Sequence, residues 1–234
     1  MIIQKIVEFF APAECLGCGL RGNFICKTCV KTVDKLPRRC FVCREKNNDG
    51  AVCERCRIKT PLSSLAVAAD YEGLVREATL TLKNKRARSV AEPLGDLIAG
   101  AVAREIAAAG GATGAAAGSA VDLVSWAPVS PARRRERGYN QAELLGRRVA
   151  RRIRLPAAEA LGRVNSPHQT GAPRAQRLTQ VAGAFYATRR LDGLRVLLVD
   201  DVATTAATLE ECARVLLAAG AAEVHAAVVA RSQN

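Results

Sequence analysis

Four C-x-x-C pairs near the N-terminus constrain this chain more than any other feature of its sequence. They are Cys15/Cys18, Cys26/Cys29, Cys40/Cys43 and Cys53/Cys56. Two intervening residues bring both sulfurs to one side of a tight turn, which suits a tetrahedral metal ion and is poor disulfide geometry. Residues 1–60 are therefore predicted to form a double zinc-ribbon module that folds around two structural zinc ions.

The pairing of these cysteines has two solutions. In the simpler, sequential one, Cys15, Cys18, Cys26 and Cys29 bind one zinc, and Cys40, Cys43, Cys53 and Cys56 bind the other. A cross-braced arrangement, in which the first pair joins the third and the second joins the fourth, stays open. A disulfide-rich secreted module is disfavoured, because the N-terminal MIIQKIVEFF lacks the features of a secretory signal.

Residues 61–234 alternate between strand-like and helix-like patterns. Strands are expected at 63–71, 121–129, 195–199 and 224–230, and helices at 74–83, 91–109, 141–154 and 209–220. This order predicts an α/β domain with a doubly wound, mostly parallel sheet covered by helices on both faces. The Ala/Gly-rich segment 110–120 is expected to be a surface connection. The remaining cysteine, Cys212, lies on the apolar side of the last helix, where a buried small side chain is favoured over a nucleophile.

Chemistry is expected where the strand RVLLV ends in Asp200 and Asp201. In a doubly wound sheet, ligands bind at the carboxyl ends of the strands. Carboxylates there accept hydrogen bonds from sugar hydroxyls or hold Mg²⁺, and a helix N-terminus after the loop ATTAAT favours an anion. These features predict a ribose 5-phosphate site, with the alternative that one aspartate only caps the turn. The chain has neither a Walker A motif nor G-x-G-x-x-G.

The net charge of +13 predicts a polyanionic partner. Residues 133–154 hold nine arginines against Glu136 and Glu143. Such a patch attracts either nucleic acid or a multiply phosphorylated small molecule, although a solvated helix face is an equal alternative. The candidates for a nucleic-acid patch are Arg147, Arg148, Arg151 and Arg152. The sequence contains no apolar run of membrane length, and a cytoplasmic protein without an integral membrane segment is expected.

The segment VLLVDDVATTAAT resembles the signature of type I phosphoribosyltransferases. The resemblance implies a ligand of the 5-phosphoribosyl 1-pyrophosphate (PRPP) type, or a related ribose phosphate, bound together with Mg²⁺. It places Asp200 and Asp201 on the ribose as the catalytic pair. The 5-phosphate would lie on the loop formed by Ala203, Thr204, Thr205, Ala206, Ala207 and Thr208.

The chain as a whole resembles the ComF family, the competence protein F group. The four cysteine pairs carry this resemblance together with P-x4-R-x3-R-G-Y-N-Q and LGRVNSPHQTGAPRAQRLTQVAGAF. It implies a pyrophosphate loop with Arg133 and Arg137, and a hood over the site at about residues 163–185. A role in DNA uptake for natural transformation, or in using DNA as a nutrient, is implied, with a DNA-translocating ATPase as partner in some relatives.

Two functions are compatible with these patterns. The chain is either a phosphoribosyltransferase whose acceptor no sequence feature identifies, or a non-catalytic protein that binds single-stranded DNA. In the second case the PRPP-type site is regulatory or vestigial. Tyr139 is the aromatic residue expected to stack on a base. In the phosphate loop this chain has Ala206 where the family has glycine, and a positive φ there would cost about 1 kcal/mol or more.

Overall fold

A computed structural model describes residues 13–47, 50–83, 87–108, 121–164 and 183–232. The predicted surface connection at 110–120 lies outside these residues, as does most of the predicted hood.

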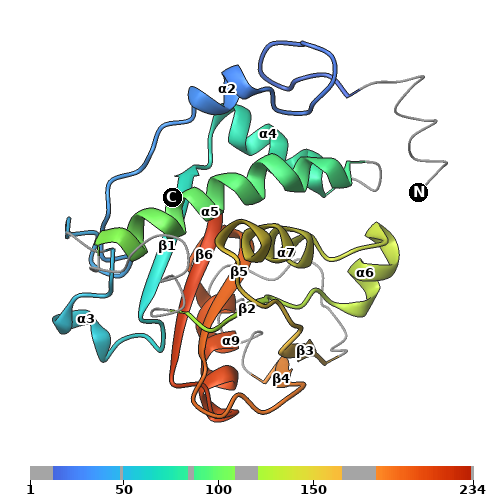
Figure 1. The fold of residues 1–234 in the computed structure, drawn as a ribbon. Coiled ribbons are helices and arrows are strands. Elements are labelled where there is room, and N and C mark those ends of the chain that lie inside the picture. Colours follow the sequence, from blue (N-terminus) through green and yellow to red (C-terminus); the bar gives the residue numbers. More distant parts are fainter. Residues whose placement is uncertain (1–12, 48–49, 84–86, 109–120, 165–182, 233–234) are drawn as a thin grey trace.

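The centre of the molecule is a four-stranded parallel sheet with the order β1-β6-β5-β2. The strands are β1 (Ser64–Asp70), β2 (Leu123–Trp126), β5 (Arg195–Ala203) and β6 (Glu223–Arg231). Each of the four strands was predicted to within a few residues. β5 differs most, since it continues through the two aspartates to Ala203 instead of ending before them. The doubly wound α/β class is confirmed (Figure 1).

Helices cover both faces of this sheet, as the burial of the central strand requires. One face carries α4 (Gly73–Leu82), α5 (Ala91–Ala108) and α7 (Gln141–Ile153), and the other carries α9 (Ala207–Ala218). Successive side chains of a strand point to opposite faces. Accordingly, Leu197 and Val199 belong to the core under α5 and α7, whereas Val196 and Leu198 pack with α9. A strand buried on both sides reads as a continuous apolar run.

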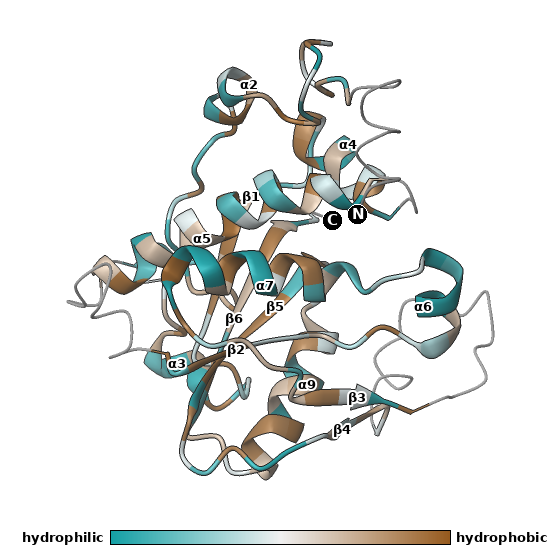
Figure 2. Ribbon diagram, turned by 45° about the vertical axis from the view of Figure 1, so that its right-hand side comes forward, coloured by the Kyte–Doolittle hydropathy of each residue, from teal (hydrophilic) through white to brown (hydrophobic). Residues whose placement is uncertain are grey.

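Within the described part of residues 61–234, four elements were not among the predicted ones. The expected arginine loop contains the short helix α6 (Pro131–Arg137), and β3 (Leu161–Arg163) pairs with β4 (Phe185–Ala187) as an antiparallel hairpin. A short 3-10 turn, η1 (Arg88–Val90), precedes α5. The start of α6 is locally encoded, because the Ser130 hydroxyl accepts the backbone N–H of Arg133 and Pro131 occupies the first turn. Figure 2 shows α6 as a strongly hydrophilic projection from the body.

The cysteine module lies along one edge of the sheet, beside the edge strand β1. It contains two short helices, α2 (Lys27–Lys31) and α3 (Glu54–Arg57). Ile25 packs into the core under α5, and Phe41 and Val52 pack into the core under α9. An antiparallel bridge from Ala51 to Ser64 joins the module to the first residue of β1. The module is therefore built into both cores of the α/β domain.

Among the described residues, no helix combines the length and the apolar character needed to cross a membrane.

Candidate functional site

The two adjacent aspartates at the carboxyl end of β5 face opposite sides of the sheet. Asp200 follows the alternation of Val196 and Leu198 toward α9, and Asp201 points toward the end of α4. The Asp200 carboxylate accepts the backbone N–H of Asp201 at 2.8 Å, and the Asp201 carboxylate accepts that of Val202 at 2.7 Å. Two differently oriented acceptors therefore flank the strand end where a sugar diol or a cation would bind.

Burial makes the carboxyl group of Asp200 harder to ionise than an ordinary carboxyl group. Removal from solvent raises the pKa of Asp200 to about 8, with a further contribution from the negative charge of Asp201. Lys83 acts in the opposite direction. A cation or a set of hydroxyl donors arriving at this carboxyl would favour its ionised form. The arrangement is typical of a ligand-binding carboxylate held at a cost in stability.

The loop after the aspartates has the shape expected of an anion cradle. Thr204 and Thr205 are exposed, and Thr208 lies in the first turn of α9. The Thr205 hydroxyl accepts the backbone N–H of Ala207 at 3.4 Å. The loop therefore brings exposed hydroxyls to the N-terminus of a twelve-residue helix, where unpaired backbone N–H groups favour negative charge.

Ala206 adopts the left-handed conformation that glycine would take more readily. Its φ is 64° and ψ is 3°, and it is the N-cap of α9. The cost expected for an alanine at positive φ is therefore present in this loop. The side chain of Ala206 is buried in the core under α9 rather than exposed on the loop. The residue is strained by about 1 kcal/mol, yet its methyl group does not cover the cradle.

Replacing Ala206 by glycine is expected to raise the free energy of unfolding by up to about 1 kcal/mol, because the strain at positive φ disappears. Ala207→Gly is a matched control with the same chemical change in the helix. It is expected to lower that free energy by up to about 1 kcal/mol. Denaturant unfolding of both variants measures the difference. Equal losses in the two variants would show that Ala206 is not strained.

Lys83 is the site residue that sequence reasoning missed. Its Nζ lies 3.2 Å from Oδ2 of Asp201, although 118 positions separate the two residues in the chain. The end of α4 is fixed there, since the Tyr139 hydroxyl donates to the carbonyl of Leu82 at 2.6 Å. Arg88 also donates to the carbonyl of Gly138 at 2.8 Å. The only signal in the sequence was the lysine at the end of a helix that follows the first strand.

The prediction that Tyr139 stacks on a base is wrong. Its side chain is buried, its hydroxyl is bonded to Leu82, and the guanidinium of Arg88 lies 4.9 Å from the centre of its ring. Burial raises the pKa of the hydroxyl. The residue therefore joins α4 to the segment after α6, and no ring face is left for a nucleic-acid base.

Arginines from two further segments approach the Asp200 side of the strand. Burial lowers the pKa of Arg163, and Arg133 contributes in the same direction while Asp200 opposes it, which places the three charges in electrostatic reach. Arg163 also lies over the ring of Phe185 at 5.2 Å. The structure thus brings Arg163, at the start of the predicted hood, into electrostatic reach of Asp200, and the predicted loop residue Arg133 into reach of Arg163. The other predicted loop residue, Arg137, is half-buried in the last turn of α6 and lies near Tyr139.

Cys212 is buried below Asp200. It is fully shielded from solvent, and burial raises its pKa well above the ordinary thiol value. The interpretation as a small core side chain is confirmed, since a protonated thiol without access to solvent is a poor nucleophile.

The predicted nucleic-acid patch on α7 is largely occupied by ion pairs. Arg148 makes a bidentate contact to Asp96 of α5, at 2.7 and 2.9 Å, and Arg152 reaches the same carboxylate at 3.2 Å. Arg147 pairs with Glu143 at 3.0 Å and lies over the ring of Trp126. Binding of DNA by this patch stays a prediction. The side chains of the α6 arginines Arg133, Arg134 and Arg135 are exposed and extend the basic surface.

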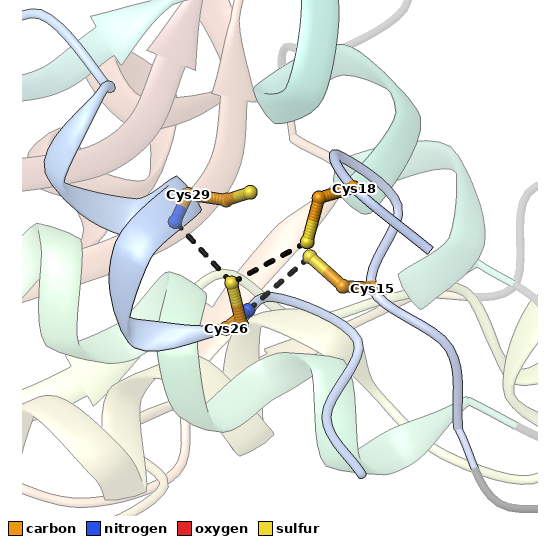
Figure 3. A group of neighbouring side chains, drawn as sticks. All are labelled: Cys15, Cys18, Cys26 and Cys29. Atoms are coloured by element: carbon orange, nitrogen blue, oxygen red, sulfur yellow. Dashed lines mark hydrogen bonds between the residues drawn. The ribbon is translucent and has the colours of Figure 1, made fainter. Parts of the chain in front are cut away.

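The eight N-terminal cysteines form two separate four-sulfur groups. In each group the four sulfur atoms lie within 4.8 Å of one another. The first group is Cys15, Cys18, Cys26 and Cys29 (Figure 3), and the second is Cys40, Cys43, Cys53 and Cys56. The pairing is sequential, and the cross-braced alternative is not formed.

Sulfur spacing in both groups suits a tetrahedral metal ion. Sγ of Cys18 lies 3.7 Å from Sγ of Cys26, and the same distance separates Cys43 from Cys53. A zinc–sulfur bond of about 2.3 Å gives a tetrahedron edge of about 3.8 Å. In the first group, the Cys26 backbone N–H donates to Cys15 and lowers the pKa of its thiol to about 6. Both sites are therefore suited to a structural zinc ion.

Comparisons with known proteins agree with this architecture. Residues 141–234 match the family described as the phosphoribosyl transferase domain. The chain is 36% identical over 106 residues to the competence protein ComFC of Bacillus subtilis (strain 168), a match that covers 45% of this chain and 42% of ComFC. It is 28% identical over 206 residues to the DNA utilization protein YhgH of Salmonella typhi, which covers 86% of this chain and 87% of YhgH.

Solved structures give weaker likenesses. The glutamine PRPP amidotransferase of B. subtilis is 19% identical with a TM-score of 0.41, covering 64% of this chain and 30% of that protein. The hypoxanthine-guanine phosphoribosyl transferase of L. donovani is 16% identical with a TM-score of 0.36, covering 60% of this chain and 71% of that protein.

The parallel sheet, the Asp-Asp strand end and the threonine loop define a phosphoribosyltransferase-type domain. This domain follows a module with two four-cysteine sites. The matches to ComFC over part of its length and to YhgH over most of it support a ComF-family protein.

Proposed function

We propose that this protein binds PRPP with Mg²⁺ at the carboxyl end of β5 and acts in the cytoplasm in DNA uptake or processing for natural competence. The single observation that supports this ligand assignment is the geometry of the strand end. There, two carboxylates of different orientation lead into exposed threonines and a helix N-terminus. The division into a zinc-binding module of residues 1–60 and a domain of residues 61–234 belongs to this proposal.

In this proposal the charges around the strand end have separate roles. Asp200 and Asp201 accept the ribose hydroxyls, and hard carboxylate oxygens of this kind also suit a Mg²⁺ ion that arrives with the ligand. The loop from Ala203 to Thr208 holds the 5-phosphate. Lys83, which contacts Asp201, and Arg133, which lies in electrostatic reach of Arg163, neutralise the pyrophosphate.

The chemistry that this arrangement supports is transfer of the phosphoribosyl group. The bond from the anomeric carbon to pyrophosphate breaks while a nucleophile bonds to the same carbon. The protein contributes orientation of the sugar and stabilisation of the leaving negative charge. Mg²⁺, when bound, supplies additional positive charge at the leaving group.

The biological role is supported by the relatives. ComFC is named a competence protein, and YhgH is named a DNA utilization protein. A basic chain with exposed arginines on α6 suits a partner that carries many phosphates, and single-stranded DNA is the partner we propose. A DNA-translocating ATPase is the proposed protein partner.

Calorimetric titration with PRPP and Mg²⁺ tests the ligand assignment. Asp201→Asn is expected to weaken binding at least about tenfold, because an amide loses the charged acceptor that interacts with the ligand. Asp192→Asn is the matched control, since it removes an exposed carboxylate from a distant turn and asparagine tolerates its φ of 40°. Equal affinity in the wild type and both variants, or no measurable binding by the wild type, would overturn the proposal.

A second candidate function is a non-catalytic protein that binds single-stranded DNA and uses the PRPP-type site for regulation. The strained Ala206 favours it, because the phosphate cradle carries an alanine at positive φ where the family resemblance implies a glycine. Release of pyrophosphate from PRPP separates the two functions. Release that proceeds in the presence of DNA or nucleobases supports the enzyme, whereas tight PRPP binding without release supports the regulatory site.

A further inference from the structure

A cavity of about 480 Å³ lies between the cysteine module and the edge of the sheet. Its walls come from residues 36–44 of the module, from β1 and α5, and from the last residue of β6. Figure 1 shows the chain between α2 and α3 passing this side of the molecule. β1 is an edge strand of the described sheet, and Leu65, Val67 and Asp70 of this strand line the cavity. The volume is that of a small ligand, at the lower end of the usual range.

Arginine dominates the charged residues that line this cavity. Five guanidinium groups face two carboxylates, Asp70 and Glu105. They come from both walls, and they are Arg38, Arg39, Arg44, Arg104 and Arg231. An excess of positive charge in a cavity with low-dielectric walls attracts anions more strongly than the same charges on an open surface.

Two of these arginines are partly removed from solvent, which disfavours their positive charge. Burial lowers the pKa of Arg104, and the neighbouring Arg38 adds to the effect while Glu105 opposes it. Burial also lowers the pKa of Arg231, with a further contribution from Arg44. Arginine stays protonated in proteins, so the cavity keeps a positive potential that a bound anion would relieve.

The guanidinium group of Arg231 is positioned by a backbone carbonyl of the module. Its Nη1 donates to the carbonyl of Phe41 at 2.8 Å, and its Nε is buried without a hydrogen-bond partner among the described residues. Arg39 likewise donates to the carbonyl of Arg44 at 3.0 Å. Backbone carbonyls position these guanidinium groups but supply no negative charge. A phosphate would supply it.

The rest of the lining is apolar, which an inorganic anion would not need. It consists of Leu36, Pro37, Phe41, Leu65, Val67 and Ala101. Guanidinium groups beside an apolar wall match a ligand with one charged end and one flat apolar end. A nucleotide has this chemistry, because its phosphate pairs with arginine while its base stacks on apolar, aromatic or guanidinium surfaces.

We propose that this cavity binds one nucleotide, either free or as part of a single DNA strand. It is separate from the ribose-phosphate loop but adjacent to it, since Arg231 is the register partner of Ala203 at the start of that loop. The proposal adds a defined nucleotide site to the proposed role in DNA handling. It does not depend on PRPP binding by the Asp200–Asp201 strand end.

Two substitutions in the zinc-loaded full chain test the cavity. Arg104→Gln removes a charge from the α5 wall, and Arg44→Gln removes one from the exposed module wall. Arg214→Gln is the matched control, because it removes the charge of an exposed arginine on α9 that pairs with Glu211. The probes are thymidine 5′-monophosphate and a labelled oligothymidylate about ten nucleotides long. Titrations at several salt concentrations give both the affinity and its salt dependence.

Each cavity variant is expected to bind the oligothymidylate about tenfold more weakly, with a salt slope lower by about one, while Arg214→Gln binds like the wild type. If the affinity for thymidine monophosphate falls by the same factor, a free nucleotide is sufficient to occupy the cavity. If only the affinity for the oligothymidylate falls, the cavity binds a nucleotide that is part of a DNA strand. Affinities within twofold of wild type for both cavity variants, or the same loss in Arg214→Gln, would overturn the proposal.

PRPP titrations of the same proteins keep this proposal distinct from the previous one. Arg104→Gln is expected to retain the wild-type affinity for PRPP, and Asp201→Asn is expected to retain the affinity for the oligothymidylate. Zinc content and thermal unfolding show whether each variant is folded. Should Arg104→Gln fail to fold, Arg44→Gln on the exposed wall decides the outcome.

Discussion

Removing zinc from this protein is expected to destabilise the phosphoribosyltransferase-type domain as well as the cysteine module. The reason is that each four-cysteine site is connected to one of the two cores. Ile25, next to the first site, packs under α5, whereas Cys40 and Cys56 of the second site are themselves members of the core under α9. Metal binding supplies roughly 10 kcal/mol or more of apparent folding free energy in small zinc modules.

The two sites are expected to contribute unequally. Cys40 and Cys56 are buried together with Phe41, Val52 and Leu62, so loss of the second metal disturbs a packed interior. The first site is more superficial, since Cys18 is exposed, whereas no cysteine of the second site is exposed. The second site is therefore the one on which the fold depends more.

Cys18→Ser and Cys43→Ser form a matched pair for this prediction. Each replaces the second cysteine of a C-x-x-C pair, and each sulfur lies 3.7 Å from a partner sulfur. Both variants are expected to retain about one zinc per chain instead of two. Cys43→Ser is expected to lower the melting temperature by roughly 10 °C more than Cys18→Ser. Atomic absorption and thermal unfolding measure the two effects, and equal melting temperatures would contradict the unequal roles.

Much of the fold could be predicted from the sequence because its signals are local. Buried strands such as RVLLV are continuous apolar runs, and C-x-x-C spacing defines a half-site within four residues. The sequential pairing was favoured by the short intervening loops, although only the structure excludes cross-bracing. The short helix α6 was missed despite a readable signal, since Ser130-Pro131 begins it and Gly138 ends it at a φ of 79°.

The features that escaped prediction depend on contacts between distant segments. Lys83 meets Asp201 only after the sheet has formed, and nothing near either residue in the chain indicates the other. The same holds for Arg148, whose partner Asp96 lies on a different helix. Tyr139 was misjudged because an amphipathic side chain suits both an exposed loop and a buried hydrogen bond.

Asp200→Asn is expected to stabilise the ligand-free protein above neutral pH while abolishing tight PRPP binding. Burial and Asp201 raise the pKa of Asp200 to about 8 in the folded state, well above the value of about 4 in an unfolded chain. Between these two values the folded state holds a proton that the unfolded state has lost. Wild-type stability from this group is therefore greatest at low pH and falls as pH rises toward 8.

The asparagine variant has no such loss, because it cannot ionise and still offers an oxygen to the Asp201 backbone N–H. Its unfolding free energy is expected to match that of the wild type near pH 3.5, where the Asp200 carboxyl group is mostly protonated in both the folded and the unfolded state. At pH 9 it should exceed the wild-type value by about 2 kcal/mol or more. Denaturant unfolding at both pH values measures this, with Asp192→Asn as the exposed control. A difference that does not grow with pH would contradict a half-buried, protonated Asp200.

The same proton connects stability to ligand binding. A ligand that brings Mg²⁺ and donates sugar hydroxyls favours the ionised carboxylate, so binding near pH 7 is expected to release a proton from Asp200. Calorimetry in buffers of different ionisation enthalpy detects that release, and PRPP affinity is expected to rise between pH 6 and about 8. Asp200→Asn removes both the proton release and the binding. Proton-independent binding by the wild type would show that PRPP, if it binds, does not contact Asp200.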